Sequence, residues 1–244
     1  MQQGYLMNNS SGRALGIASI VVLLGICIAV IAFFPTFAQR LFPGLRILAG
    51  ETSQPGAGSV LLSDDFSSAQ WGTSANADNS VEYADNALHM NVYGQNSFVW
   101  SPPNDQDYQN IHMEVTVINN GTDSTTAFGL VCNRQAVDES FYFFAITPAG
   151  QYAIAKATQG ESDVFLTNDD QWTSSDLIPT DAASYRVGAD CGSGTLTLYL
   201  DGQQIASISD ASYVNGGVAV FTWSGEEATT TDVSFDDFLM TQLP

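Results

Sequence analysis

Residues 185–208 constrain the fold of this chain more than any other stretch, because apolar and polar side chains alternate through three short runs. A period of two places one face of a β-strand on a core. Glycines between the runs, in 192–194 and at Asp201-Gly202, supply the positive φ that tight hairpin turns require. The stretch therefore predicts three consecutive antiparallel strands. Their core-facing residues are Val187, Ala189, Cys191, Leu196, Leu198, Leu200, Ile205 and Ile208.

Further strand patterns recur at short spacing, and no segment after residue 50 shows a sustained helical period. An all-β domain with this many strands needs two sheets. We therefore predict an all-β, two-sheet antiparallel sandwich over residues 60–244, preceded by one N-terminal transmembrane helix. The other expected strands cover residues 60–66, 80–83, 88–92, 98–100, 111–117, 128–132, 141–146, 152–155, 218–222 and 233–240.

The first 59 residues divide into an anchor and a linker. Residues 1–13 are short and polar, whereas residues 14–35 form an apolar run that contains no charged residue and ends at a proline. A run of about 18 or more apolar residues crosses the roughly 30 Å hydrocarbon layer, so we predict a transmembrane signal anchor. A cleaved signal peptide is the rival interpretation, but the run is longer than the usual apolar region of about 7 to 15 residues. Residues 36–59 then form a juxtamembrane segment and a linker rich in Gly, Ser and Pro.

The acidic residues are confined to the part of the chain beyond the anchor. All 26 Asp and Glu residues lie from Glu51 onward, and the chain carries a net charge of −20. Such a surface repels phosphate backbones, which excludes nucleic acid as a partner. Solubility accounts for these acids, and binding of a divalent cation by some of them is the alternative.

Two of the three cysteines, Cys132 and Cys191, each end an expected strand of the domain. An even pair in a Lys-poor domain rich in Ser, Thr, Asn and Gly indicates an oxidising compartment and one disulfide. Two buried free thiols are the alternative. The positive-inside rule gives no clear orientation of the helix, so the cysteines and the acidic domain decide it. We predict a single-pass cell-membrane protein whose C-terminal domain is extracytoplasmic.

Motifs rich in aromatic residues and glycine follow one another in a characteristic order over residues 60–241. They are Leu62-Ser63-Asp64-Asp65-Phe66 before Trp71, residues 128–132, residues 141–146 running into Gly150-Gln151-Tyr152, residues 172–175, residues 185–202, residues 216–220 and residues 233–238. This order resembles the concanavalin A-like lectin/glucanase jelly rolls, which include laminin-G-like modules and 3-keto-disaccharide hydrolase (DUF1080-like) domains. Bacterial cell-surface proteins with such a domain beyond a membrane anchor look similar, often with cysteines at these two positions. The order is specific for the fold and not for an activity.

The sequence Asp-Asp-Phe occurs near both ends of the domain, at residues 64–66 and 236–238. The resemblance implies that the first and last strands lie side by side, and related jelly rolls often hold a structural Ca²⁺ near the paired termini. Ca²⁺ prefers several oxygen ligands and tolerates irregular geometry. The candidate ligands are Asp64, Asp65, Asp236 and Asp237. The alternative is that the phenylalanines pack inward while the aspartates solvate the outer face.

The residues offer little support for catalysis. The glucanases of the superfamily use a Glu-x-Asp-x-x-Glu strand, but here Glu161-Ser162-Asp163 is followed by Val-Phe-Leu, so the second Glu is missing. The sequence also lacks a nucleophile motif, a phosphate loop and zinc-ligand spacing. A glycoside-acting enzyme, with a carboxylate pair drawn from the many acids, therefore ranks behind a binding module.

Tryptophans provide the candidate binding residues, because sugar rings stack on Trp and Tyr. Trp172 is the best candidate and lies in a polar loop beside Asp169 and Asp170. Trp100 and Trp223 lie at strand ends and could line the rim of the binding site. Packing of Trp172 within the domain is the alternative. We predict a membrane-tethered, non-catalytic recognition or adhesion module for a glycan or another surface polymer. A structural or accessory subunit of a membrane or envelope assembly, docked on membrane-protein partners through its helix, is the first alternative.

Overall fold

The computed structural model describes residues 58–225 and 230–244, and within these residues every regular element is a β-strand. The strands follow the alternation and the turn residues of the sequence. Their bounds are β1 (Val60–Asp64), β2 (Ser74–Ala75), β3 (Asn79–Ala84), β4 (Ala87–Val92), β5 (Phe98–Ser101), β6 (Ile111–Asn119), β7 (Ala127–Arg134), β8 (Phe141–Ile146), β9 (Gln151–Ala157), β10 (Val164–Phe165), β11 (Thr173–Ser174), β12 (Ser184–Cys191), β13 (Leu196–Leu200), β14 (Gln203–Ile208), β15 (Gly217–Trp223) and β16 (Thr231–Gln242).

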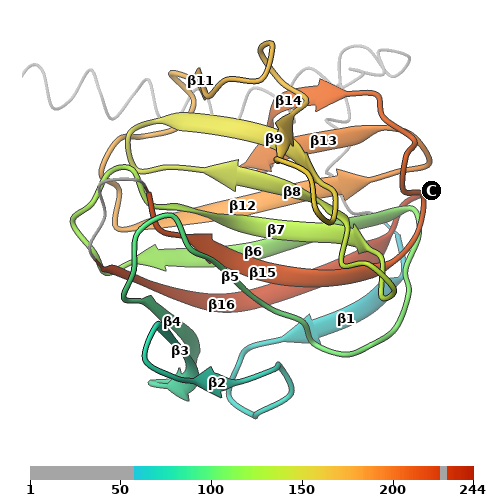
Figure 1. Cartoon of the computed structure of the whole chain (residues 1–244). Helices are drawn as coiled ribbons and strands as arrows, with labels where there is room; N and C mark the ends of the chain where they lie inside the picture. The colour runs from blue at the N-terminus through green and yellow to red at the C-terminus, as the bar shows by residue number, and fades with distance from the viewer. Residues whose placement is uncertain (1–57, 226–229) are drawn as a thin grey trace, which may run out of the picture. The chain divides into compact units, whose positions relative to one another are not determined.

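The strands form two antiparallel sheets packed face to face, as the all-β prediction requires (Figure 1). The nine-stranded sheet has the order β14-β13-β12-β6-β16-β4-β3-β2, with β1 on β16. The seven-stranded sheet has the order β10-β9-β8-β7-β15-β5, with β11 on β9. The first and last strands pair, with Asp64 opposite Phe238, so their predicted adjacency is confirmed.

The three strands predicted from residues 185–208 are present as the meander β12-β13-β14. The turns use the predicted residues, because Gly194 has a φ of 87° and Asp201 and Gly202 have φ values of 50° and 74°. Beyond the meander, β12 pairs with β6 from Ser184 to Cys191. The meander therefore forms one end of the nine-stranded sheet.

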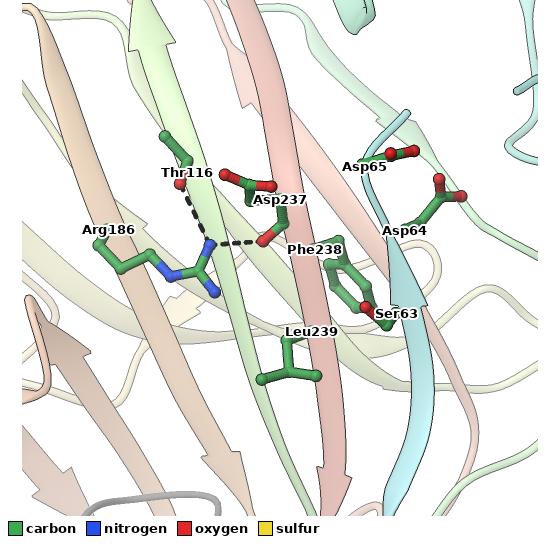
Figure 2. Close-up of a pocket in the computed structure, with 8 residues that line it drawn as sticks. All are labelled: Ser63, Asp64, Asp65, Thr116, Arg186, Asp237, Phe238 and Leu239. Carbon is green, nitrogen blue, oxygen red and sulfur yellow. Dashed lines mark hydrogen bonds between the residues drawn. The ribbon is translucent and has the colours of Figure 1, made fainter. Parts of the chain in front are cut away.

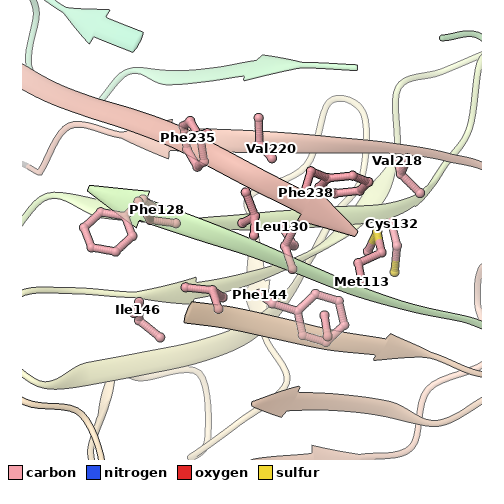
Figure 3. Packing of buried hydrophobic residues seen from close by; sticks show 14 of the residues in the cluster. Met113, Phe128, Leu130, Cys132, Phe144, Ile146, Val218, Val220, Phe235 and Phe238 are labelled. Atoms are coloured by element: carbon pink, nitrogen blue, oxygen red, sulfur yellow. The ribbon is translucent and has the colours of Figure 1, made fainter. Parts of the chain in front are cut away.

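The main core lies between the two sheets, where alternate residues of the facing strands interdigitate (Figure 3). Phe128, Leu130 and Phe144 enter it from the seven-stranded sheet, and Phe235 and Phe238 enter it from β16. Burial of one such side chain contributes about 1.5–3 kcal/mol. The phenylalanines of both Asp-Asp-Phe motifs are buried, as one of the two alternatives for these motifs expected.

A disulfide joins the two sheets through this core. Cys132 on β7 and Cys191 on β12 are bonded, with Cα atoms 6.6 Å apart and a sequence separation of 59. Both residues are fully buried. The predicted disulfide is confirmed, and the alternative of two free thiols is wrong.

The predicted transmembrane helix over residues 14–35 lies outside the described residues. From residue 58 to 225 and from 230 to 244, no helix is long and apolar enough to span a membrane.

Candidate functional site

The central strands of the seven-stranded sheet are apolar on both faces. In β8 every residue from Phe141 to Ile146 is buried, and β7 and β15 are nearly as fully buried. Residues that alternate with the main core form a second cluster on the opposite side of this sheet. We call its aromatic residues the aromatic face: Phe98, Trp100, Phe141, Phe143, Phe165, Trp172, Phe221 and Trp223.

Side chains of the aromatic face reach over the sheet from both of its edges. Strands β5 and β8 are separated by β15 and β7, which at normal strand spacing places them about 14 Å apart. The ring of Phe98 on β5 nevertheless lies 5.4 Å from the ring of Phe143 on β8, and it stacks on Phe221 at 4.5 Å. The rings therefore lean inward and cover the centre of the sheet.

Small residues make this inward lean possible. Gly129, Ala145 and Ala153 stand opposite one another on β7, β8 and β9. A Cβ atom at Gly129 would lie 3.4 Å from the Phe221 ring and only 2.0 Å from the carbonyl oxygen of Phe144. The small side chains of this row leave space that the larger rings of the aromatic face occupy.

Trp172 and Trp223 contact each other on the aromatic face, although they come from different parts of the sheet. Trp172 lies in the loop between β10 and β11, and Trp223 ends β15. Their ring centroids are 6.1 Å apart with an interplanar angle of 28°, and Phe165 packs edge-on against Trp172 at 5.1 Å. Both indoles are partly exposed. The structure thus places two of the three predicted tryptophans in contact.

The two aspartates beside Trp172 have different positions. Asp170 accepts a hydrogen bond of 2.6 Å from the backbone N–H of Phe165, which ties the Trp172 loop to β10. Asp169 is exposed and has a positive φ of 50°. Asp170 therefore positions the loop, and Asp169 remains available to a ligand.

Trp100 lies on β5 at the other end of the aromatic face, two residues from Phe98. The guanidinium carbon of Arg134, the last residue of β7, lies 4.6 Å from its ring centroid. Such a cation–π contact contributes about 0.5–2 kcal/mol. All three predicted tryptophans therefore belong to one face of one sheet.

Arg134 and the phenylalanines of this face were not among the binding residues predicted from the sequence. The signal for the phenylalanines was the unbroken apolar run Phe141–Ile146, since a strand buried on both faces does not alternate. A lone arginine at a strand end carries no comparable pattern.

The strands of the seven-stranded sheet contain no Asp or Glu. Acidic strand residues all belong to the nine-stranded sheet, and they are Asp64, Glu82, Glu114, Asp190, Asp232, Asp236 and Asp237. The aromatic face therefore has an apolar surface whose strands bring no carboxylate to it.

Three of the four predicted calcium ligands line a pocket of about 420 Å³ on the outer face of the nine-stranded sheet. Figure 2 shows Asp64 at the end of β1 and Asp65 just after it, with Asp237 on the neighbouring β16. Arg186 lies on β12, beyond β6. Arg186 donates hydrogen bonds to the Thr116 hydroxyl and to the Asp237 carbonyl oxygen. The pocket is therefore polar, with charges of both signs in its wall.

Three of the four candidate ligands, Asp64, Asp65 and Asp236, accept hydrogen bonds from nearby groups of the protein. Asp64 accepts hydrogen bonds from the Phe66 N–H at 2.8 Å and from Trp71 Nε1 at 2.9 Å. Asp65 accepts one from the Ser67 N–H, and Asp236 accepts one from the Asp237 N–H. In the described part of the chain, no group of three or more His, Cys, Asp or Glu residues is arranged to hold a metal ion. The geometry gives the Ca²⁺ prediction no support, and it stays a prediction.

A charged chain of side chains runs across the same sheet beside this pocket. His112, which is 1% exposed, lies 2.6 Å from Asp190 through Nδ1 and 3.2 Å from Glu114 through Nε2. Tyr199 donates to Asp190 at 2.7 Å, and Arg186 lies 3.3 Å from Glu114. Burial lowers the pKa of His112, but the two carboxylates outweigh it and raise this pKa to about 9. The hydrogen bonds and ion pairs of this network connect strands β13, β12 and β6.

Known proteins resemble this chain in structure and not in sequence. No protein-family profile matches the chain. No curated protein is significantly similar to it in sequence. Solved structures, in contrast, are similar over most of the domain.

Three of these structures illustrate the likeness. The carbohydrate-binding module CBM66 from Bacillus subtilis is 11% identical, with a TM-score of 0.54 over 71% of this chain and 96% of its own. A Bacillus subtilis protein of unknown function with a galectin-like fold is 11% identical, with a TM-score of 0.57 over 76% and 96%. The Bacillus licheniformis β-glucanase is 11% identical, with a TM-score of 0.51 over 77% and 100%. At this identity the likeness defines the fold alone, and the domain has the concanavalin A-like lectin/glucanase jelly-roll fold.

Proposed function

We propose that this chain is a membrane-tethered, extracytoplasmic recognition or adhesion module that binds a glycan or another surface polymer on its aromatic face. One observation carries the proposal: Trp100, Trp172 and Trp223 lie on one face of one sheet, each partly exposed. Indole rings present flat apolar surfaces with a polar N–H at the edge. Pyranose rings stack their C–H faces on such surfaces and direct their hydroxyls outward.

The likeness to solved structures supports a glycan as the ligand. One similar structure is a carbohydrate-binding module, and another is a β-glucanase. Both use the same two-sheet architecture, and it is this architecture that gathers the tryptophans here. The similar structures therefore support glycan binding through the fold alone. The argument from chemistry comes from the tryptophans of the aromatic face.

We propose binding without hydrolysis, and the carboxylates near the aromatic face, Asp169 and Asp170, come from a loop and not from the strands. Retaining hydrolysis needs two carboxyl groups about 5 Å apart, and inversion needs about 6.5 to 9.5 Å. The strands beneath the aromatic face bring neither Asp nor Glu to it.

The membrane and extracytoplasmic parts of the proposal rest on the sequence and the disulfide. Residues 14–35 have the length and apolarity of a membrane span. The Cys132–Cys191 bond belongs to an oxidising compartment, since cytosolic thiols are kept reduced.

The test is a glycan array and a polysaccharide pull-down with the full-length protein, each run with Ca²⁺ and with a chelator. We expect saturable binding that Trp172→Ala weakens about tenfold, which corresponds to about 1.4 kcal/mol. Leu177→Ala is the matched control, because Leu177 is 44% exposed in the same segment between β10 and β12 and lies outside the aromatic face. Loss of binding with the chelator would support the calcium site.

Two results would contradict the proposal. If Trp172→Ala and Leu177→Ala bind equally well, the ligand lies elsewhere on the domain. If the full-length protein binds no glycan in either condition, an accessory subunit of a membrane assembly becomes the better interpretation.

A further inference from the structure

The three Lys and Arg residues in the described part of the chain differ in their partners. Lys156 lies 3.3 Å from Asp210, and Arg186 lies 3.3 Å from Glu114. Arg134 forms no ion pair with any residue in 58–225 or 230–244. In a chain with 26 acidic residues and six basic ones, a cation without an acidic partner is unusual. Arg134 is also the cation that belongs to the aromatic face.

The side chain of Arg134 is held in place by apolar contacts. Its guanidinium lies over the Trp100 ring at 4.6 Å and crosses Gly217, its partner on β15. A Cβ atom at position 217 would lie 3.4 Å from Nε, which is ordinary van der Waals contact, so the guanidinium packs directly against this part of β15. The group is therefore positioned before any ligand arrives, which lowers the entropy cost of binding.

The hydrogen-bonding capacity of this guanidinium is not met by the protein. Arg134 Nε is buried and has no hydrogen-bond partner among the described residues. A guanidinium carries five N–H donors in a planar fork, and a buried donor without a partner costs about 1–3 kcal/mol. Because Nε is enclosed by the protein, a ligand would bind the two terminal amino groups of the guanidinium instead.

The surrounding electrostatics favour an anionic acceptor at this position. The strands of the seven-stranded sheet contain no Asp or Glu, so the nearest strand carboxylates lie on the other sheet. Repulsion from those acids is screened over a Debye length of about 8 Å at physiological ionic strength. Asp138 and Glu139 lie in the turn that follows Arg134, so the attraction of an anion to this position comes from direct contact with the guanidinium.

We propose that the aromatic face recognises an acidic sugar, with Arg134 binding the carboxylate of a uronic acid residue. This inference rests on the proposed glycan-binding function and names the class of glycan. A carboxylate matches the planar fork of the guanidinium and accepts two parallel N–H bonds. One guanidinium balances one carboxylate, whereas a phosphate monoester would bring about two negative charges.

The test compares uronate polymers with their own methyl esters, because esterification removes the charge and leaves the sugar rings. Polygalacturonate, alginate and hyaluronate are titrated into the full-length protein by calorimetry, each beside its methyl ester. We expect at least one free acid to bind at least tenfold more tightly than its ester. Arg134→Gln should bind the free acid at least tenfold more weakly than the native protein does. Arg134→Lys should recover part of this affinity.

Lys156→Gln is the matched control, because it removes one positive charge from the same sheet outside the aromatic face. It should leave the affinity for the free acid unchanged. Dextran sulfate controls for bulk charge, and equal binding of this polymer would overturn the proposal. The comparison of acid with ester needs no variant, so it decides the matter even if Arg134→Gln does not fold.

The remaining outcomes separate this inference from the proposed function. If only neutral glycans bind, or if acid and ester bind equally, the acidic-sugar inference fails and the glycan-binding proposal stands. If no glycan binds on the array or in the titrations, both fail.

Discussion

At the scale of single residues, His112 shows how a side chain on the outer face of a sheet becomes part of a charged network. Its position on β6 turns it away from the main core, yet it is 1% exposed and lies between Asp190 and Glu114. Two carboxylates close to one imidazole favour its charged form. A protonated histidine in this place ties β6 to β12 without contributing to the apolar core.

This network makes the stability of the domain depend on pH. The pKa of His112 is about 9 in the folded protein, above its ordinary value of 6.5, so folding favours the proton. The stabilisation is complete below pH 6.5 and is lost as the pH rises through 9, and the difference corresponds to about 3 kcal/mol. Urea unfolding at pH 6, 7.5 and 9 should show this decline.

Two variants distinguish His112 from the rest of the molecule. His112→Gln should flatten the dependence between pH 6.5 and 9, because glutamine has no proton to lose. His89→Gln is the control, since His89 contacts the Ser234 hydroxyl and forms no ion pair with a described carboxylate. An unchanged slope in His112→Gln would show that another group carries the pH dependence.

At the scale of elements, the close pairing of β7 and β8 depends on Gly129. A Cβ at this position would meet the Phe144 carbonyl oxygen at 2.0 Å, and backbone atoms of a paired strand cannot move aside. Gly129→Ala should therefore lower the free energy of unfolding by about 3 kcal/mol or more. Chemical denaturation of the two proteins measures the difference.

Gly160 supplies the matched control for this prediction. It also has a positive φ, at 79°, but a Cβ there would meet nothing within 4 Å. Gly160→Ala should cost only about 1 kcal/mol, the conformational penalty of the left-handed region. Equal losses in the two variants would mean that the approach of β8 to Gly129 does not limit stability.

The elements also show which parts of the fold a sequence can predict. The meander β12-β13-β14 was predictable because period-two alternation and glycine turns are local signals. The sheet order β8-β7-β15-β5 is not local, since it brings together strands far apart in the chain. The candidate tryptophans could therefore be named from the sequence, whereas their common face with Phe98 and Arg134 came only from the pairing.

At the scale of the whole molecule, the two sheets are specialised in different ways. The nine-stranded sheet carries the acidic strand residues and the His112 network on its outer face. The seven-stranded sheet carries the aromatic face. Apolar packing joins the sheets, and Cys132–Cys191 is the covalent bond between them. The contribution of this bond to the stability of the sandwich therefore requires oxidising conditions.

Removing that bond should destabilise the entire sandwich. The disulfide links residues 59 positions apart, and such a crosslink stabilises by about 2–4 kcal/mol, chiefly by restricting the unfolded chain. The double variant Cys132→Ala, Cys191→Ala should lose this amount in urea unfolding, plus about 1 kcal/mol for the space left by two buried sulfurs. Dithiothreitol should shift the midpoint of the native protein in the same direction and leave the double variant unchanged. The sheets separate only when the domain unfolds. A midpoint unaffected by either treatment would therefore mean that apolar packing alone holds them together and that the disulfide is not needed for stability.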